Sequence, residues 1–359
     1  MNQNITEKDL AFLKHAISLA NKGTSLVYPN PRVGAVYVKD DKIIAEGYHE
    51  KVGEKHAERN VELKESLENS TLYVSLEPCS HHGKTPPCVD FIIENKIKKV
   101  VFAIKDPGEG AGGAQALKEA GIAVEGPFEI NEAHRILEPF IKNMLHKQTY
   151  ISAKWAMSLD GRIATKTKKS KWISGEESRK DVHLFRSVVD GIMVGAGTLV
   201  SDNPKLNIRY GIKGCAPRPI VWDPAGKTIG QNWYSENIDR KPIILVKKHI
   251  DAPEGCKVIL FENLKDIPTL LFEEGIHHVL LEGGAQLLGF AKDVGIIDAV
   301  ICYIAPKLIG GLHALSPMGG KGVDEMSEAI QLTHQDFSCV GQDIKLQGLL
   351  KRYHPSLIV

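Results

Sequence analysis

Two cysteines, Cys79 and Cys88, lie in the stretch "EPCSHHGKTPPC", with eight residues between them and a proline beside each. Two histidines and a lysine fall within the same stretch. Cysteine and histidine are common zinc ligands, so this spacing points to a metal site. The other four cysteines are scattered at positions 215, 256, 302 and 339, which argues against a disulfide scaffold in a chain of this length. Cys79 and Cys88 are therefore candidate metal ligands.

A third ligand lies upstream, in the triplet "HAE" formed by His56 and Glu58. We predict a helix over "KHAERNVELKES", opening near His56, followed by a strand over "TLYVSL". A His-x-Glu at a helix start, followed about twenty residues later by Pro-Cys and a second cysteine, is typical of zinc deaminases. In those enzymes the histidine and two cysteines bind zinc and the glutamate does not. His56, Cys79 and Cys88 are thus predicted zinc ligands.

This donor set predicts hydrolytic deamination. Three ligands leave a fourth position open for water, and zinc lowers the pKa of that water to roughly 7. Glu58 is then expected to carry a proton from the water to a ring nitrogen and on to the departing amine. A purely structural zinc site is the alternative. It needs a fourth protein ligand, which His81 or His82 could supply.

The spacing of the cysteines restricts the substrate. Nucleoside and nucleic-acid deaminases place the two cysteines two residues apart, whereas "SHHGKTPP" separates them here. The longer loop brings Lys84 to the rim of the site, where it can pair with a phosphate or stay solvated. We therefore expect a small phosphorylated amino-heterocycle.

Composition and charge exclude some partners. The 359 residues carry a formal net charge of +1, which supplies no broad field for nucleic acid or an anionic membrane. The start "MNQNITEKDL" lacks the apolar core of a signal peptide, and no apolar run approaches the roughly 18 residues that span a bilayer. We expect a cytoplasmic protein that binds neither nucleic acid nor membrane.

Strands and helices alternate twice along the chain, with a change near residue 149. The first alternation predicts a mostly parallel sheet with helices on both faces. It ends in a connecting helix over residues 130–147, which we expect Pro139 to break. The second begins at "YISAKWAMS" and needs its own sheet, so we predict domains at 1–148 and 149–359.

Motifs from both halves resemble one family, the bifunctional deaminase–reductases of riboflavin biosynthesis. The first half carries "YPNPRVGAV", "HAE" and "EPCSHHGKTPPC". The second carries "KWAMSLDGRIAT", "VGAGTLVSDNPKLNIR" and "LEGGAQLLG". The resemblance implies an α/β chain, with an N-terminal cytidine-deaminase-like three-layer domain and a C-terminal dihydrofolate-reductase-like domain. We also expect a homo-oligomer.

The activity implied by the resemblance has two steps. The first is deamination of 2,5-diamino-6-ribosylamino-4(3H)-pyrimidinone 5′-phosphate by zinc-bound hydroxide. The second is NADPH-dependent reduction of the ribosyl group to ribityl. The residues implied to contact the first substrate are Asn30, His49 and Lys84. Asn30 lies between two prolines, so it also suits a turn.

The resemblance also implies reductase-site residues. The positions implied for NADPH are Ala156, Trp172, Thr198, Asp202, Gly284, Ala285, Gln286, Leu287, Leu288, Gly289 and Phe290. The positions implied for substrate are Ser170, Arg186, Leu206, Arg209 and Glu282. No Gly-x-Gly-x-x-Gly follows a strand, so a standard Rossmann fingerprint is absent. "LEGGAQLLG" offers a helix start for a cofactor phosphate, although an ordinary tight turn has the same pattern.

The sequence departs from the family after "KVVFAI". The family usually continues with Asp-Pro-Asn-Pro and a longer loop, whereas "KDPGEGAGG" is shorter and lacks the second Asn-Pro. No contact is therefore inferred for this loop.

Two other functions stay open: a nucleotide or nucleic-acid base deaminase with an unrelated C-terminal domain, and a zinc-binding module without catalysis. The near-neutral charge and the cysteine spacing argue against the first. The joint presence of all three ligands and Glu58 argues against the second.

Overall fold

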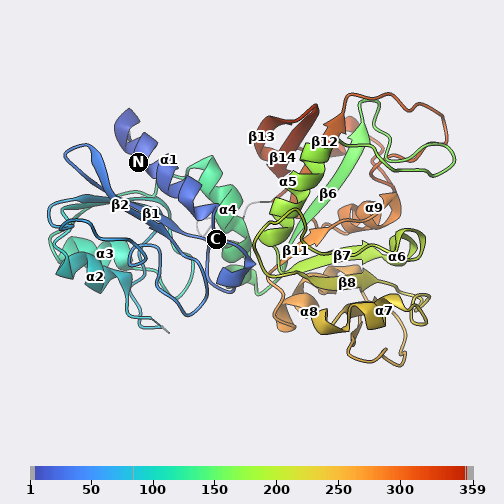
Figure 1. Ribbon diagram of the computed structural model, residues 1–359, viewed down its shortest axis with the longest axis horizontal. Coiled ribbons are helices and arrows are strands. Elements are labelled where there is room, and N and C mark those ends of the chain that lie inside the picture. The colour runs from blue at the N-terminus through green and yellow to red at the C-terminus, as the bar shows by residue number, and fades with distance from the viewer. Residues whose placement is uncertain (1–4, 84, 352, 354–359) are drawn as a thin grey trace. The chain divides into compact units, whose positions relative to one another are not determined.

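The chain folds into two units (Figure 1). The computed structural model describes residues 5–83, 85–351 and 353. Of these, the residues up to 146 and Tyr353 belong to the first unit, and the residues from 147 to 351 belong to the second. No helix in the described ranges is long and apolar enough to cross a membrane. The domain limits predicted from the sequence, 1–148 and 149–359, remain a prediction.

The first unit is built on a five-stranded sheet of order β2-β1-β3-β4-β5. Strand β1 pairs antiparallel with β2 and with the central strand β3, and β3, β4 and β5 run parallel. β3 and β4 are almost continuously buried, as expected for parallel strands covered on both faces. The bounds are β1 (Gly34–Lys39), β2 (Lys42–Tyr48), β3 (Thr71–Leu76), β4 (Lys99–Ile104) and β5 (Ala123–Glu125).

Helices cover both faces of this sheet, which makes three layers (Figure 1). α1 (Glu7–Ala20) and α4 (Asn131–His146) lie together on one face, and α2 (Cys88–Glu94) and α3 (Gly113–Glu119) lie together on the other. A short 3-10 turn, η1 (Ser25–Val27), precedes β1. The prediction of helices on both faces is confirmed, but the sheet is mixed rather than mostly parallel, because two of its four strand pairs are antiparallel.

Pro139 does not break α4, so that prediction is wrong. The helix continues through the proline over 16 residues. A proline inside a helix removes one hydrogen bond and costs about 3 kcal/mol. Here Pro139 is itself buried, beside Leu137, Phe140 and Ile141, which belong to the core of the first unit. The packing of this face outweighs the cost of the proline.

The helix predicted to open at His56 is also absent. The chain makes one turn, in which the N–H groups of Arg59 and Asn60 donate to the His56 carbonyl at 3.0 and 2.8 Å. The turn ends because Val61 pairs with Gly47 of β2 in an isolated antiparallel bridge. Pairing with the sheet therefore outweighs helical propensity in this segment.

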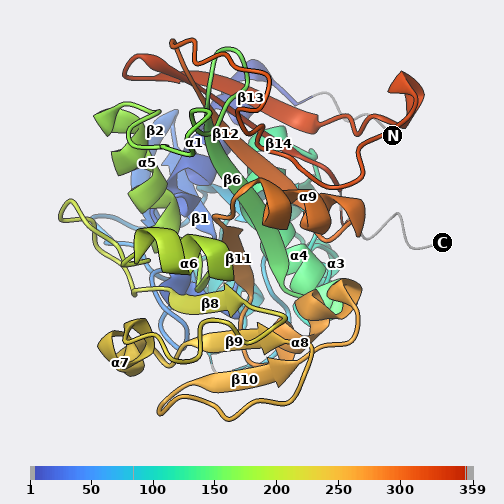
Figure 2. The same cartoon turned by 90° about the vertical axis from the view of Figure 1, so that its right-hand side faces the viewer.

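The second unit is built on a nine-stranded sheet within its described residues (Figure 2). The order is β10-β9-β8-β7-β11-β6-β12-β14-β13, parallel from β10 to β12 and antiparallel at β14 and β13. The bounds are β6 (Tyr150–Ser158), β7 (Gly191–Gly195), β8 (Arg218–Trp222), β9 (Ile243–Val246), β10 (Lys257–Leu260), β11 (His278–Leu281), β12 (Ala299–Ala305), β13 (Thr333–Val340) and β14 (Asp343–Leu349).

This sheet is buried on both faces because successive residues of a strand point to opposite sides. Ile243 and Leu245 of β9 belong to a core that includes residues of α8 and α9. Ile244 and Val246 belong to a second core, with residues of α6 and α7. The helix bounds are α5 (Glu176–Ser187), α6 (Ala196–Asp202), α7 (Trp233–Glu236), α8 (Ile267–Glu273) and α9 (Ala285–Asp293); the 3-10 turns are η2 (Ile238–Arg240), η3 (Leu264–Asp266) and η4 (Met326–Glu328).

Because β2 closely approaches the turn after His56, we predict that a side chain at Gly47 disturbs this turn. A Cβ atom at Gly47 would lie 2.1 Å from the Asn60 carbonyl oxygen, so Gly47→Ala must displace this turn. We expect a lower melting temperature of the first unit by calorimetry and weaker zinc binding. Gly53→Ala is the control, because a Cβ there meets nothing within 4 Å and only its positive φ of 83° adds strain. Equal zinc affinity in Gly47→Ala and Gly53→Ala would contradict this expectation.

Candidate active sites

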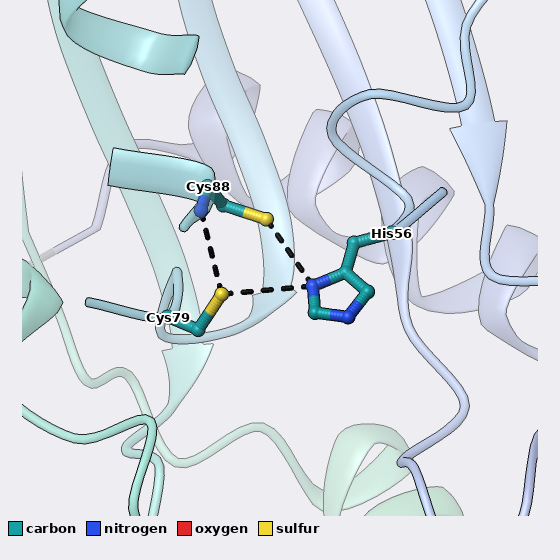
Figure 3. A group of neighbouring side chains, drawn as sticks. All are labelled: His56, Cys79 and Cys88. Carbon is teal, nitrogen blue, oxygen red and sulfur yellow. Dashed lines mark hydrogen bonds between the residues drawn. The ribbon is translucent and has the colours of Figure 1, made fainter. Parts of the chain in front are cut away.

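The side chains of His56, Cys79 and Cys88 converge in the first unit (Figure 3). Nδ1 of His56 lies 3.4 Å from Sγ of Cys88 and 3.6 Å from Sγ of Cys79, and all three ligand atoms lie within 4.8 Å of one another. Cys79 follows β3, Cys88 is the first residue of α2, and His56 lies in the turn after β2. The sheet thus brings together three residues that the sequence spreads over two loops.

The arrangement fits a tetrahedral zinc ion. Zinc holds imidazole nitrogen at about 2.0–2.1 Å and thiolate sulfur at about 2.3 Å, so such ligands lie about 3.5 Å apart on a tetrahedron. The hydrogen bond with Cys88 lowers the pKa of Cys79 to about 4, which favours the thiolate that metals bind. Among the described residues, neither His81 nor His82 nor any other metal-ligating side chain joins the cluster. This leaves the fourth position open, as in catalytic rather than structural sites.

Thr85 orients the histidine of the cluster. Its Oγ1 lies 3.2 Å from Nε2 of His56, the ring nitrogen that faces away from the two sulfurs. With Nδ1 turned to the sulfurs as an unprotonated ligand, Nε2 carries the hydrogen and donates it to the threonine hydroxyl. A hydrogen bond of this kind fixes the tautomer and orientation of a metal-binding histidine.

Glu58 lies beside the cluster at a cavity of about 280 Å³. It is only 4% exposed, and this burial raises the pKa of its carboxyl group, so it can hold a proton closer to neutral pH. The Tyr37 hydroxyl donates to the backbone carbonyl of Glu58 at 2.9 Å and fixes the position of this residue. The cavity volume lies just below the range for small-molecule sites, roughly 300–1,000 Å³.

Two residues implied to contact substrate, Asn30 and His49, line the same cavity. Nδ1 of His49 lies 3.0 Å from the Lys55 carbonyl and donates to it, so Nε2 accepts from the Asn30 amide nitrogen at 3.2 Å. Burial lowers the pKa of His49, which keeps the ring neutral. The Asn30 amide oxygen remains an acceptor, with no donor to it among the described residues. Lys84, the third predicted residue, lies outside the described residues.

Asp106 is another carboxyl group that lines this cavity, and it was not identified from the sequence. Burial raises its pKa to about 6. Glu77 accepts hydrogen bonds from the N–H groups of Ala114 at 2.9 Å and Asp106 at 3.2 Å, which ties the loop after β4 to the cysteine loop. The signal available in the sequence was an Asp-Pro pair at the end of an apolar strand, in the loop that departs from the family.

In the second unit, Glu282 is the centre of a charged cluster. Arg186 of α5 donates to its two oxygens at 2.8 and 3.1 Å, and Nζ of Lys154 lies 3.7 Å away. Burial alone would raise the pKa of Glu282, but Arg186 and Lys154 outweigh it and hold the pKa at about 2. Glu282 is therefore a fixed anion at neutral pH, held by a two-point contact with a guanidinium group.

Two residues near the Glu282 cluster, Lys154 and His183, were not identified as site residues from the sequence. Lys154 is a charged residue within the apolar strand "YISAKWAMS", which is an available signal. His183 precedes Arg186 by three residues on α5, and residues at that spacing share a helix face. His183 is buried and accepts a hydrogen bond from the Arg209 N–H through Nδ1 at 3.0 Å.

Most residues implied for the cofactor lie at one edge of the second sheet. Neighbouring parallel strands β7, β11 and β6 end at this edge, which is where open α/β sheets bind ligands. Ala156 lies near the end of β6, and Thr198 and Asp202 lie on α6, directly after β7. The segment 284–290 follows β11 as the N-cap and first turns of α9.

Ser170 and Trp172 are not brought into the Glu282 cluster. Both lie in the segment between β6 and α5 and are exposed, Trp172 by 66%. The Arg179 guanidinium lies 4.7 Å from the Trp172 ring, and Lys307 donates to the Trp172 carbonyl at 3.0 Å. In the described part of the chain, no hydrogen bond or ion pair joins Ser170 or Trp172 to Glu282.

Two known protein families match this chain, one in each of its two units. Residues 6–104 match the cytidine and deoxycytidylate deaminase zinc-binding region, and residues 149–346 match the RibD C-terminal domain. The riboflavin biosynthesis protein RibD of Actinobacillus pleuropneumoniae is 39% identical over 358 residues, which cover 95% of each chain. The chain belongs to the RibD family.

Solved structures of RibD proteins agree over almost the full length. The diaminohydroxyphosphoribosylaminopyrimidine deaminase/5-amino-6-(5-phosphoribosylamino)uracil reductase of Thermotoga maritima is 34% identical, with a TM-score of 0.83, covering 95% of this chain and 98% of its own. Acinetobacter baumannii RibD is 33% identical, with a TM-score of 0.81, covering 96% and 99%.

Membership in the RibD family confirms the expected fold class: an N-terminal cytidine-deaminase-like domain and a C-terminal dihydrofolate-reductase-like domain. The chain is a bifunctional deaminase and reductase of riboflavin biosynthesis, and its deaminase domain carries the zinc-site residues His56, Cys79 and Cys88. The nucleic-acid deaminase and the zinc-binding module without catalysis are thereby set aside. The roles of the individual cavity and reductase residues stay predictions.

The contact between Thr85 and His56 predicts an effect on metal binding. Thr85→Val keeps the shape of the side chain but removes the hydroxyl group, so we expect zinc to bind about tenfold more weakly, as for other lost partners of metal-binding histidines. Competition with a chromophoric chelator measures this without substrate. Thr85→Ser keeps the hydroxyl group and is expected to bind zinc as the wild type does. Unchanged zinc affinity in Thr85→Val would show that the hydroxyl group does not support His56.

The charge pair in the RibD C-terminal domain predicts a pH-dependent stability. With its pKa at about 2, Glu282 stabilises the fold above the unfolded-state pKa of about 4.3, and this contribution is lost as pH falls toward 2. Arg186→Met removes the main counter-charge, so burial raises the pKa of Glu282. We expect the free energy of unfolding to fall by about 3 kcal/mol at pH 7 and to recover partly at pH 5, where Glu282 takes up a proton.

Tryptophan fluorescence during denaturant unfolding measures this effect in the second unit, because Trp155, Trp172, Trp222 and Trp233 all lie there. Adding Glu282→Gln to Arg186→Met is the control. The double variant is expected to lose the recovery at pH 5, because no carboxyl group remains to be protonated. Recovery of the same size in both variants would assign the pH response to another group.

Proposed function

We propose that the first unit removes the 2-amino group of 2,5-diamino-6-ribosylamino-4(3H)-pyrimidinone 5′-phosphate, and that the second unit reduces the ribosyl group of the product to ribityl with NADPH. The observation that carries this proposal is the His56, Cys79 and Cys88 cluster beside the buried Glu58, in one chain with a RibD C-terminal domain. The Thermotoga relative, whose name describes both activities, supports it.

In the deaminase reaction Glu58 moves the protons. Zinc bound by His56, Cys79 and Cys88 would lower the pKa of a water molecule and supply hydroxide near neutral pH. Glu58 takes one proton from the water and passes it to the adjacent ring nitrogen; it then takes the second proton from the hydroxyl group newly bonded to C2 and passes it to the leaving amine. The bond from C2 to oxygen forms, the bond from C2 to nitrogen breaks, and ammonia leaves. The raised pKa of Glu58 suits this exchange, because the group must gain and lose a proton.

The cavity residues orient the pyrimidine. The Asn30 amide oxygen accepts from an N–H group of the base, because its amide nitrogen is already engaged by the neutral ring of His49. His49 is fixed in turn by the Lys55 carbonyl. Lys84 pairs with the phosphate, a role supported by its place in the loop between the two cysteines.

In the reductase reaction the cofactor carries the hydride and the protein orients the reactants. The residues proposed to bind NADPH are Ala156, Trp172, Thr198, Asp202 and residues 284–290. The N-terminal end of α9 faces its phosphates with free backbone N–H groups. The residues proposed to bind substrate are Ser170, Arg186, Leu206, Arg209 and Glu282. Glu282 accepts hydrogen bonds as a carboxylate, because its pKa of about 2 leaves it no proton to donate.

Two further features complete the proposal: a homo-oligomer and a cytoplasmic location. Both are expectations of the sequence analysis, and the scattered cysteines, which argue against a disulfide scaffold, support the cytoplasmic location.

A coupled assay tests the proposed function. Ammonia release from the diaminopyrimidine phosphate is measured on zinc-loaded protein without NADPH, and NADPH absorbance is then followed in the same cuvette. We expect ammonia first, and NADPH oxidation that depends on it. Glu58→Gln is expected to bind zinc normally, to release ammonia more slowly by at least a factor of 100, and to reduce the deaminated compound at the wild-type rate when that compound is supplied directly.

Three results would contradict the proposal. Near-normal ammonia release by Glu58→Gln would remove the proton-transfer role. Ammonia release from deoxycytidylate or cytidine but not from the diaminopyrimidine would replace the substrate. Ammonia release without NADPH oxidation would leave the reductase step without support.

A further inference from the structure

The segment 204–209, here called the substrate loop, is held in place mainly by side chains from other elements. It follows α6 and carries Leu206 and Arg209, two of the residues proposed to bind substrate. The contacts to its backbone are Trp233 Nε1 to the Pro204 carbonyl at 2.8 Å, Arg240 to the Lys205 and Leu206 carbonyls at 2.7 and 2.6 Å, Arg186 to the Asn207 carbonyl at 2.9 Å, and the Arg209 N–H to His183 Nδ1 at 3.0 Å.

This loop needs such support because its backbone is strained. Leu206 within the loop has a φ of 46°, and the flanking residues Asn203 and Tyr210 have φ values of 41° and 64°; residues with a Cβ atom rarely adopt such values. A residue in this region costs roughly 1 kcal/mol or more and persists only where surrounding contacts impose it. Without these side-chain contacts, the loop is expected to relax to another conformation.

His183 holds the end of the loop at which Arg209 lies. Its Nδ1 accepts from the Arg209 N–H, so the ring hydrogen is on Nε2, and its ring meets the ring of Tyr210 edge to face at 5.1 Å. Burial, with Arg186 and Arg209 nearby, lowers the pKa of His183 to about 4. The ring is therefore neutral near pH 7, which an acceptor at Nδ1 requires.

Arg209 is a cation at this site that remains available for an anion. Arg186 is committed to Glu282, whereas the Arg209 side chain is exposed and has no carboxylate within 4 Å among the described residues. A phosphate binds most strongly to a guanidinium group whose position is fixed in advance. The position of Arg209 depends on its backbone, which His183 holds.

We propose that His183 is a positioning residue of the reductase site: by accepting the Arg209 N–H, it holds the substrate loop so that the Arg209 guanidinium binds the substrate phosphate. The inference rests on the proposed function, because it takes the phosphorylated pyrimidine as the ligand of the second unit. It adds a residue for which that function assigned no role.

The test separates the acceptor atom from the ring. In His183→Asn, the amide oxygen lies near the place of Nδ1 and can accept the same hydrogen bond. In His183→Gln the amide lies one carbon farther out, and His183→Met offers no acceptor. For each variant, NADPH oxidation is measured with the deaminated phosphate compound and with its dephosphorylated form. Ammonia release by the first unit of the same chain and the thermal transition of the second unit control for folding.

We expect His183→Gln and His183→Met to raise the KM for the phosphate compound about tenfold or more, while the KM for NADPH and ammonia release stay within twofold. His183→Asn is expected to remain within about threefold of the wild type. With the dephosphorylated compound, all variants are expected to match the wild type, and so is Arg209→Gln. The double variant of His183→Gln with Arg209→Gln should have the same KM for the phosphate compound as Arg209→Gln alone, because both changes remove the same interaction, that of Arg209 with the phosphate.

The inference is overturned if His183→Gln and His183→Met keep the wild-type KM, if His183→Asn is as impaired as His183→Gln, or if the defect persists with the dephosphorylated compound. The last result would make His183 a general support of the fold. These failures are distinguishable from failure of the proposed function. If the proposed function is wrong, the wild-type protein itself oxidises no NADPH with the deaminated compound, and the inference about His183 is then wrong as well.

Discussion

Both sites depend on loops whose backbone is held by polar side chains from other parts of the chain rather than by strand or helix hydrogen bonds. In the first unit, Glu77 accepts from two N–H groups of the segment after β4 and ties it to the cysteine loop. In the second, Arg240 and Arg186 donate to successive carbonyls of the substrate loop. Parallel strands end at one edge of each sheet and deliver these loops there. The sheets supply the scaffold, and these polar side chains fix the positions of the loops that carry the site residues.

Two glutamates show how the surroundings assign different roles to one residue type. Glu58 is buried without a strong cation at its carboxylate, so burial raises its pKa and it can exchange a proton. Glu282 is also largely buried, but Arg186 and Lys154 reverse the direction and keep it ionised. The first group suits proton transfer, and the second suits a fixed negative charge that orders its neighbours. Burial alone does not decide between these roles, because the nearest charge outweighs it.

The sequence was informative where chemistry depends on residue type and spacing. His56, Cys79 and Cys88 could be grouped because zinc demands that set of donors, and the structure brings them together. The helix predicted after His56 was wrong because a long-range bridge to Gly47 outweighs local propensity. The contacts of His183 with Arg209 could not be predicted, since they join a side chain to a backbone N–H group, and a backbone N–H group has no residue type to recognise.

The two proposed reactions make opposite demands on one substrate skeleton, and the two sites differ accordingly. Deamination occurs on the base, so the reacting ring must enter a small cavity beside Glu58, with the phosphate left at the rim. Reduction occurs on the ribosyl carbon, so the chain between base and phosphate must lie against the cofactor. A flexible chain is held at a fixed place most effectively from both ends. Glu282 and Arg209 offer an anion and a cation that suit the N–H groups of the base and the phosphate. Arg186 and His183, which contact Glu282 and the Arg209 backbone, both lie on α5, so this helix positions both groups proposed to bind the reductase substrate.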